Sequence, residues 1–402
     1  MFTRAQRIAR AGPLQYLILV PTLRCNLSCS YCQVSRADED ARGFDWDEET
    51  LEAVVRRVAQ LEVPSPKIEF QGGEPSLRPD LINAVIEAVP SDVDATFVIC
   101  SNLQSLSEGF LEIVERPDVQ ISTSLDGDFA THARQRQGGE GATQSFMNNL
   151  DLLLGRFGPD KISALPTIDM AAPPEIDDLI DAYAGRGLTS IYLRPVNYHG
   201  FARKRHPASL AQSNQWRDYH QRFVRRLIDR NWATKGAVLE ETYFSHILRR
   251  IFQPGVDGHV DLRNPNAVGR DYVIVDFDGR VFPTDEARML TRSGIIDLAI
   301  GDIHGGWDTP ERDALDAAST NFGDPVCEGC AYQPYCGRDL IDDIARYGTI
   351  SLPRDQTEFC RRHLDLFDFA FDLIHEKDEK TQHSLRRWLG LAGDSLELGI
   401  ER

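Results

Sequence analysis

The feature that most constrains the fold is an alternation of short apolar runs with helical patterns between Tyr16 and Pro195. Strands that alternate with helices predict parallel βαβ units with right-handed crossovers. Six such units match an incomplete (β/α)6 TIM barrel, and an open Rossmann-like sheet of six strands is the alternative topology. In the barrel, the residues that carry the chemistry follow the C-terminal ends of the strands. The six expected strands are 16–21, 67–71, 95–100, 119–125, 161–168 and 190–195.

The pattern changes after Pro195, where a connection leads into two expected helices. From Asp271 the residues alternate around Asp278-Gly279, which is a hairpin signal. Loops with cysteines follow, and 361–376 has the spacing of an amphipathic helix. The expected organisation is an α/β core over 1–200, a helical connection over 201–265, a C-terminal domain over 266–376 and a tail over 377–402.

Composition excludes several classes of protein. The chain has 44 Lys and Arg against 62 Asp and Glu, and its formal net charge of −18 argues against a nucleic-acid binder, whose affinity comes from neutralising phosphates. No apolar run approaches the roughly 18 residues that span a bilayer. The basic N-terminal segment leads into no signal-peptide core. We therefore expect a cytoplasmic protein without membrane spans, in which the eight cysteines indicate metal ligands before disulfides.

Three cysteines, Cys25, Cys29 and Cys32, directly follow the first expected strand, with three and then two residues between them. A tetrahedral zinc site needs a fourth ligand, and no His or further Cys lies nearby in the sequence. A [4Fe–4S] cluster bound by three cysteines leaves one iron without a protein ligand, and that iron can chelate a small molecule. A three-ligand zinc loop and a set of buried thiols are the alternatives.

A second motif, Gln71-Gly72-Gly73-Glu74-Pro75, follows the second expected strand, and the two motifs together resemble the radical S-adenosylmethionine (SAM) enzymes. The resemblance implies that the amino and carboxylate groups of SAM chelate the open iron, with Gly72, Gly73 and Glu74 at the amino end. It places Tyr31 beside the adenine. The other residues expected to bind SAM are Ser101, Asn102, Ser124, Arg136 and Arg194, of which Arg136 matches an arginine that pairs with the SAM carboxylate. Ser101, Asn102 and Arg194 are equally consistent with a turn former, a cap and a surface charge.

Four late cysteines, Cys327, Cys330, Cys336 and Cys360, have a spacing for which a structural zinc site is one interpretation. The spacing also resembles the SPASM extension of peptide-modifying radical SAM enzymes, although Leu340 stands where that extension has a further cysteine. Its upstream cysteines are absent too. The resemblance therefore implies a reduced SPASM-type domain with one auxiliary [4Fe–4S] cluster, which these four cysteines ligate fully and which takes or relays an electron.

Within this family the chain looks most like the paired maturases of the His-Xaa-Ser-system type, which cross-link ribosomally made peptides. The resemblance implies reductive cleavage of SAM, hydrogen abstraction by the 5′-deoxyadenosyl radical from a precursor peptide, and formation of a side-chain cross-link. Asp285 and Glu286 are the candidates for acid/base catalysis, although a solvated carboxylate or one paired with Arg288 is an equally simple role. The basic residues at 203–206 and 217–230 indicate either a solvated helix face or a docking surface for an acidic precursor peptide.

The expected partners are the precursor peptide, an electron donor such as ferredoxin or flavodoxin, and a partner maturase or leader-binding protein. Two other enzymatic functions stay open: oxidation of a Cys or Ser side chain, as in the anaerobic sulfatase maturases, and a radical reaction on a small-molecule biosynthetic intermediate. A zinc-binding scaffold that uses both cysteine groups is the non-enzymatic alternative.

Overall fold

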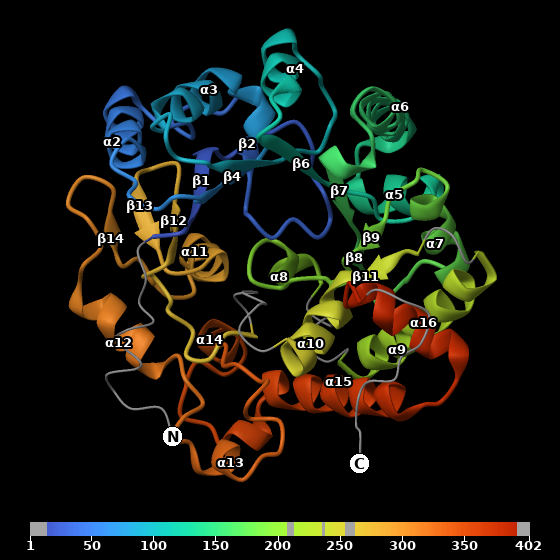
Figure 1. Ribbon diagram of the computed structural model, residues 1–402. Coiled ribbons are helices and arrows are strands. Elements are labelled where there is room, and N and C mark those ends of the chain that lie inside the picture. The colour runs from blue at the N-terminus through green and yellow to red at the C-terminus, as the bar shows by residue number, and fades with distance from the viewer. Residues whose placement is uncertain (1–13, 207–212, 235–237, 254–261, 392–402) are drawn as a thin grey trace.

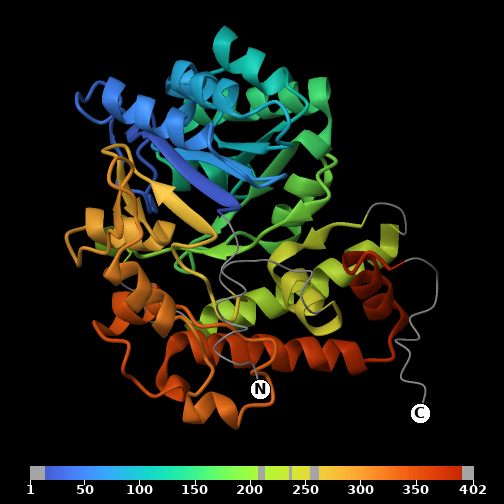
Figure 2. The same cartoon turned by 60° about the vertical axis from the view of Figure 1, so that its left-hand side comes forward.

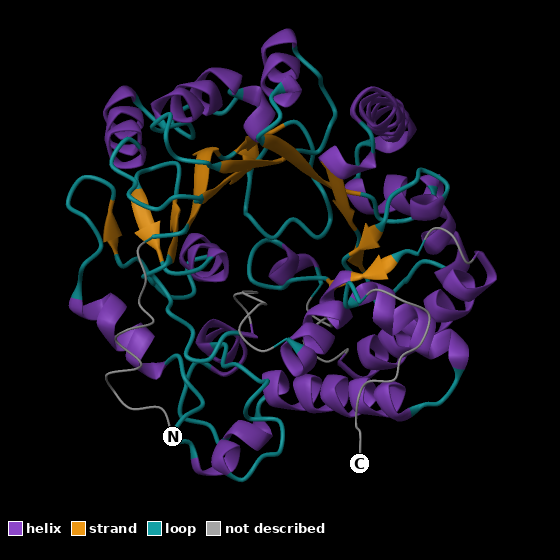
Figure 3. Cartoon of the chain, in the orientation of Figure 1, coloured by secondary structure: helices purple, strands orange, loops and turns teal. Residues whose placement is uncertain are grey.

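An eight-stranded sheet in the order β14–β13–β12–β1–β4–β5–β6–β7 organises the chain (Figure 1). The computed structural model describes residues 14–206, 213–234, 238–253 and 262–391. The strands curve into an arc with helices along its outer side (Figure 3). The strands of this sheet are β1 (Tyr16–Thr22), β4 (Lys67–Gly72), β5 (Thr96–Cys100), β6 (Val119–Ser124), β7 (Ile162–Leu165), β12 (Tyr272–Val275), β13 (Arg280–Phe282) and β14 (Gly301–Asp302).

Five of the six expected strands lie in this sheet, and each pairs in parallel with its neighbour, as the alternating pattern predicts. Strand β1 is at the centre, and all but its first residue are buried. This agrees with the near-continuous apolar run of Tyr16–Thr22, because a parallel strand is covered on both faces. The arc confirms an α/β fold with a parallel sheet.

The sixth expected strand is interrupted. Residues 190–195 form two short pieces, and the main-chain nitrogen of Leu193 between them donates to Glu241 Oε1 at 3.1 Å instead of to a neighbouring strand. The ladder therefore changes partner within one run. The short strands are β8 (Thr167–Ile168), β9 (Ser190–Ile191), β10 (Arg194–Pro195) and β11 (Glu240–Glu241), with β10 paired to β8 and β11 to β9; β2 (Arg24–Cys25) pairs with β3 (Ala37–Asp38).

The hairpin expected at Asp278-Gly279 forms between β12 and β13, and Gly279 adopts the positive φ of 79° that the turn requires. Its first strand pairs in parallel with β1, with Tyr272 opposite Tyr16. The part of the expected C-terminal domain that holds the hairpin is therefore continuous with the core sheet.

Helices follow the strands of the arc, and capping residues in the sequence mark several of their first turns. Asp47, for example, accepts a hydrogen bond from the backbone nitrogen of Thr50 at 2.8 Å, and the buried residues Ala53, Val54 and Val58 face the sheet. The helices of this layer are α2 (Glu48–Val58), α3 (Pro79–Ala88), α4 (Glu108–Glu115), α5 (Phe129–Arg136), α6 (Gly139–Phe157) and α7 (Ile176–Ala184), with single 3₁₀ turns at η1 (Pro75–Leu77) and η2 (Pro159–Lys161).

A second group of helices lies across the open side of the arc, where the long helix α15 runs below the sheet in both views (Figures 1 and 2). This helix confirms the amphipathic pattern at 361–376, but it begins at Glu358, because Thr357 caps it by accepting from the Cys360 nitrogen at 3.3 Å. The remaining elements are α8 (Ala202–Arg205), α9 (Ser213–Thr234), α10 (Thr242–Phe252), α11 (Asp285–Arg292), α12 (Pro310–Ala318), α13 (Pro325–Glu328), α14 (Leu340–Tyr347), η5 (Arg354–Gln356), α15 (Glu358–His375) and α16 (Glu379–Trp388).

Most of the arginines of α9 form ion pairs within the molecule. Arg226 and Arg230 both contact Asp177 on α7, at 2.8 and 2.9 Å. Others reach α15 and the residue that follows it, Arg217 at Asp365 and Arg225 at Glu376. These pairs tie α9 to its neighbours, which accounts for much of the basic pattern at 217–230. None of the helices in the described residues is long and apolar enough to span a bilayer.

Candidate active site

The three early cysteines line one cavity of about 240 Å³ at the C-terminal ends of the parallel strands. A tight turn shapes their loop, since the Cys32 nitrogen donates to the Cys29 carbonyl at 3.2 Å. Burial, with the Glu74 carboxylate as a further contribution, raises the pKa of the Cys25 thiol to about 12. Such buried thiols lose their protons at neutral pH when a cation binds them, so the donor set fits a metal centre.

Gly72 and Gly73 at the end of β4 make room for the segment that leads into Cys25. A Cβ atom on Gly73 would lie 2.2 Å from the Leu23 carbonyl oxygen and 2.3 Å from that of Arg24. A Cβ on Gly72 would lie 2.2 Å from the Thr22 carbonyl oxygen. Both glycines also line the cavity. Their close approach is therefore to the chain's own backbone, in addition to any contact with SAM.

Glu74 is buried in the wall of the cavity, where its carboxylate accepts from two backbone nitrogens, those of Ser76 at 3.1 Å and Asn102 at 2.7 Å. Burial raises the pKa of this carboxyl. The Asn102 side chain in turn donates to Asn26 Oδ1 at 2.8 Å and lies 3.7 Å from Cys25 Sγ. Glu74 and Asn102 thus link the second motif to the cysteine loop. Ser101 also lines the cavity, and its hydroxyl accepts from the Leu103 nitrogen at 3.1 Å, as a turn former does.

Tyr31 and Arg136 meet at a carboxylate that the sequence analysis did not single out. The Tyr31 hydroxyl donates to Asp126 Oδ2 at 2.6 Å, and Arg136 Nε donates to the same oxygen at 3.2 Å. The other side of the Arg136 guanidinium lies 3.7 Å from Cys29 Sγ. Asp126 follows Ser124 directly after β6, so its place at a strand end was the available signal. Ser124 itself lines the cavity.

Arg194 and Pro195 line this cavity and also a second one of about 150 Å³, so the two cavities share a wall. The second cavity lies between the end of the arc and helices α9, α10, α14 and α15. Its walls carry both aromatic and charged side chains: Tyr192, Tyr198, Trp216, Tyr243, Arg194, Arg346, Arg362, Glu286, Asp339, Asp342 and Glu358.

The two predicted acid/base residues differ in position. Glu286 lines the second cavity. Asp285 instead accepts from the buried Arg288, at 2.9 Å from Nε and 2.7 Å from Nη2. The pairing with Arg288 is the structural role that the sequence analysis held open for Asp285. Of the two, Glu286 is therefore the carboxylate that a bound substrate can meet.

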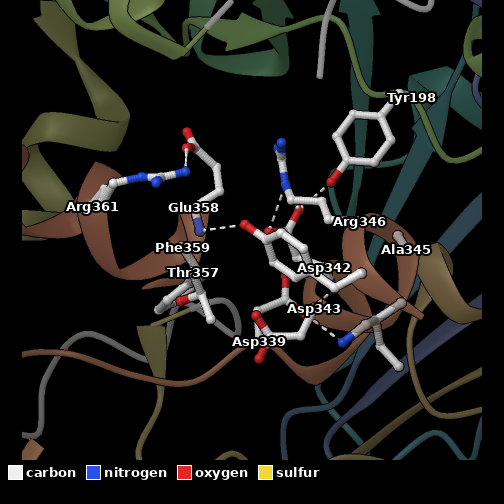
Figure 4. Close-up of polar contacts among 12 residues, drawn as sticks. Tyr198, Asp339, Asp342, Asp343, Ala345, Arg346, Thr357, Glu358, Phe359 and Arg361 are labelled. Atoms are coloured by element: carbon white, nitrogen blue, oxygen red, sulfur yellow. Dashed lines mark hydrogen bonds and ion pairs between the residues drawn. The ribbon is translucent and has the colours of Figure 1, made fainter. Parts of the chain in front are cut away.

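Asp342 is a further carboxylate of the second cavity, and the sequence analysis missed it. The Tyr198 hydroxyl donates to its Oδ1 at 2.5 Å, and Arg346 Nε donates to its Oδ2 at 2.9 Å (Figure 4). Burial favours the neutral acid, but Arg346, Arg362 and Tyr198 outweigh it and lower the pKa of Asp342, so this carboxyl is charged at neutral pH. Figure 4 shows Tyr198 reaching down to α14, an approach that no local pattern in the sequence indicates.

The late cysteines gather where α13, the loop after it and the first turn of α15 meet. Burial raises the pKa of Cys327 to about 11 and that of Cys336 to about 12, and charges on the other cysteines of the group raise both further. Arg354 acts in the opposite direction on three of the four, Cys327, Cys336 and Cys360. In the part of the chain that the structure describes, no three His, Cys, Asp or Glu side chains are placed to hold a single metal ion.

Comparison with known proteins adds a family and several relatives. Residues 19–182 match the model of the Radical SAM superfamily. The chain is 32% identical to a probable GTP 3′,8-cyclase of Methanocella arvoryzae over 44% of its own length and 56% of the relative. It is 25% identical to the PqqA peptide cyclase of Gluconobacter oxydans over 69% of its length and 72% of the relative. A cysteine-type anaerobic sulfatase-maturating enzyme of Clostridium novyi is 23% identical over 68% and 73%.

Other matches are shorter or structural. An uncharacterized protein of Methanocaldococcus jannaschii is matched over 39% of its length, so the chain spans about half the length of some curated relatives. The structure described as "Native anSMEcpe with bound AdoMet" superposes with a TM-score of 0.70 and 15% identity over 90% of this chain and 97% of that one. Streptococcus suis SuiB bound to precursor peptide SuiA gives 0.58 and 13% over 89% and 79%. At these identities the two structures show the fold alone.

Proposed function

We propose that this enzyme, which carries a radical SAM domain and is related to peptide-modifying maturases, forms a cross-link between side chains of a ribosomally synthesised precursor peptide. The chemistry that a bound [4Fe–4S] cluster and SAM supply is reductive generation of a 5′-deoxyadenosyl radical, which abstracts hydrogen from the substrate. The single observation that carries the proposal is the wall shared by the two cavities. Through Arg194 and Pro195, a group bound beside the three cysteines adjoins a substrate in the second cavity.

The first cavity offers donors for both cofactors. Cys25, Cys29 and Cys32 would bind the cluster, and the cationic side chains of Arg136 and Arg194 line the same space, where they suit the carboxylate of SAM. The other residues proposed to bind SAM are Tyr31, Gly72, Gly73, Glu74, Ser101, Asn102 and Ser124. Each of these nine residues lines the cavity, although Glu74 and Asn102 also hold the cysteine loop by their hydrogen bonds.

The second cavity suits a peptide side chain better than a purely polar metabolite. Its aromatic residues, among them Tyr192, Trp216 and Tyr243, offer surfaces on which an aromatic or aliphatic side chain packs. Cross-linking removes one proton and one electron after hydrogen abstraction. Glu286 and Asp342 face this space as carboxylates that can accept the proton. The names of two relatives, a peptide cyclase and a maturase bound to its precursor peptide, support the same substrate class.

The electron requires an outlet, and we assign it to an auxiliary [4Fe–4S] cluster on Cys327, Cys330, Cys336 and Cys360. Support comes from the mutual electrostatic effects of these buried thiols. Four protein ligands leave no open iron, so this centre would transfer electrons without binding substrate. A ferredoxin or flavodoxin would supply the electron that starts each turnover, and a partner maturase or leader-binding protein would present the peptide.

A second candidate function is oxidation of a Cys or Ser side chain. It is favoured by the match to the sulfatase-maturating relative and by the extent of the superposition on anSMEcpe. The match to a GTP 3′,8-cyclase keeps a reaction on a small molecule as a third outcome.

The test begins with anaerobic purification and reconstitution. We expect a brown protein with roughly eight irons per chain for two clusters, and release of 5′-deoxyadenosine from SAM under reducing conditions. Replacement of Cys25, Cys29 and Cys32 by alanine should abolish that release, while the Cys327→Ala variant should keep it and lose only auxiliary-cluster iron. Stoichiometric zinc in a colourless protein, or release unaffected by the triple replacement, contradicts the proposal.

The substrate class is tested by coexpression with the short peptides encoded beside the gene, followed by mass spectrometry. A peptide that loses two hydrogens and yields linked fragments supports cross-linking. Loss of two hydrogens confined to one Cys or Ser supports the second candidate. Absence of any change in every peptide, with 5′-deoxyadenosine still released, points to the small-molecule reaction.

A further inference from the structure

Asp126 is a buried carboxylate in direct contact with two residues of the SAM site. It lies just beyond β6 and is fully inaccessible to solvent, at 0% exposure. Its Oδ2 accepts from Tyr31 and Arg136, while its Oδ1 accepts from the Thr167 nitrogen at 2.9 Å. One side chain thus connects the cysteine loop, α5 and β8.

The guanidinium of Arg136 lies between Asp126 and the cysteine loop. Its Nε donates to the carboxylate at 3.2 Å, and its Nη1 lies 3.7 Å from Cys29 Sγ, within range of a hydrogen bond to sulfur. Its centre is 5.4 Å from the centroid of the Tyr31 ring. Since Arg136 is held from two sides, its positive charge is kept against the sulfur of one cluster ligand.

From this geometry we infer that Asp126 is a positioning residue, which fixes Arg136 at Cys29 so that the pair of opposite charges sets the reduction potential of the cluster on Cys25, Cys29 and Cys32. The inference rests on the proposed function, because it assumes a cluster at these cysteines. It adds to that function a control on how readily the cluster is reduced, and hence on when SAM is cleaved. Hydrogen bonds and charges at cluster sulfurs are an established determinant of such potentials.

The two charges act on the sulfur with opposite signs. A cation near a cluster favours the reduced state, which carries one more negative charge, and an anion disfavours it. The pKa of the Cys29 thiol shows the same opposition: burial raises it, Arg136 lowers it and Asp126 raises it. Removing one charge and then the other should therefore shift the potential in opposite directions. A merely structural role for Asp126 makes no such demand.

The test measures the midpoint potential of this cluster by EPR-monitored redox titration, in protein whose auxiliary site carries the Cys327→Ala replacement to leave one signal. Asp126→Asn keeps an oxygen for the Thr167 nitrogen and removes the charge, so we expect a more positive potential. Arg136→Gln should give a more negative one. We expect each shift to change the reduced-to-oxidised ratio on the order of tenfold, which is 59 mV for one electron. The double variant should return toward the parent value.

Two further variants keep the test decisive. Tyr31→Phe removes a donor from Asp126 without changing any formal charge, and the less neutralised carboxylate should lower the potential by less than Arg136→Gln does. Asp118→Asn removes a carboxylate near the opposite end of β6, where it pairs with Arg116, and should leave the potential unchanged. Shifts of the same sign in Asp126→Asn and Arg136→Gln, or no shift in Tyr31→Phe, overturn the inference even when the cluster assembles. Failure of the parent protein to assemble any cluster instead overturns the proposed function.

Discussion

At the scale of single residues, the site depends on side chains that hold the cysteine loop as much as on those that face a ligand. Gly73 leaves space for two carbonyl oxygens, and Glu74 ties its own strand end to Asn102. Asn102 then reaches Asn26 and Cys25 in the loop. A short glycine–glutamate motif thus contributes to the geometry of three cysteines about fifty residues away in the chain, as well as lining the cavity itself.

Gly73→Ala tests this role. The added Cβ would lie 2.2 and 2.3 Å from the carbonyl oxygens of Leu23 and Arg24, so the loop must move. We expect the variant to lose most of the iron of the first cluster and, as overpacked sites do, about 1–3 kcal/mol of unfolding free energy. Iron analysis and chemical denaturation measure both. The matched control is Gly155→Ala on α6, where a Cβ meets nothing within 4 Å and iron content should be unchanged.

At the scale of elements, helix α15 brings the last cysteine to the others. Its N-terminal cap is Thr357, whose hydroxyl accepts from the backbone nitrogen of Cys360 in the first turn. Further along, Tyr243 on α10 lies 2.8 Å from His363 Nε2, while His363 Nδ1 lies 2.7 Å from the Phe359 carbonyl. A carbonyl only accepts, so Nδ1 carries the proton and Nε2 accepts from the tyrosine. The helix thus links the proposed auxiliary centre with the wall of the second cavity.

Thr357→Ala should therefore affect stability and cluster retention together. Loss of a cap costs about 1 kcal/mol, and fraying of the first turn should speed loss of iron from the auxiliary centre. Thr357→Ser should restore both. Thr309→Ala removes the corresponding cap of α12, where the hydroxyl accepts from the Arg312 nitrogen at 3.3 Å. It should lower the unfolding free energy by a similar amount with no change in iron loss, and equal iron loss in both variants would contradict the assignment.

At the scale of the whole molecule, two histidines are buried at positions where the sheet meets the rest of the structure. Burial lowers the pKa of His132 and of His199 to about 4 each, from an ordinary value of 6.5. The unfolded chain therefore binds more protons than the folded one between these values. The stability that both histidines contribute is complete above pH 6.5 and falls as the pH drops toward 4.

Chemical denaturation of cluster-free protein at several pH values checks this. We expect the unfolding free energy to fall between pH 7 and 5 by on the order of 2 kcal/mol for each histidine. His132→Phe keeps a ring stacked on Phe146, now 4.2 Å from the imidazole, and should make the decline shallower. His304→Gln, at an exposed position, serves as the control and should leave the slope as it was. A pH-independent free energy in the parent protein would refute the prediction.

Most of the fold could be predicted because its signals are local. Parallel strands such as β1 are buried on both faces and appear as apolar runs, and the turn at Gly279 follows from one dipeptide. The sixth strand could not be predicted in detail, because a side chain of Glu241, almost fifty residues away, takes the hydrogen bond of Leu193. For the same reason the acid/base candidates were only half informative: Glu286 faces the cavity, whereas Asp285 is taken by Arg288.

The sequence by itself determined the cysteine loop, the glycine–glutamate motif and the parallel core, since each depends on residues close together in the chain or on the burial of a single strand. Only the tertiary structure decided that Asp126 joins Tyr31 to Arg136, that Asp342 meets Tyr198 in the second cavity, and that β12 extends the sheet beside β1. These contacts join residues from ten to more than two hundred positions apart. Their energies come from burial and from opposite charges brought together in space, which leave no periodic trace in the sequence.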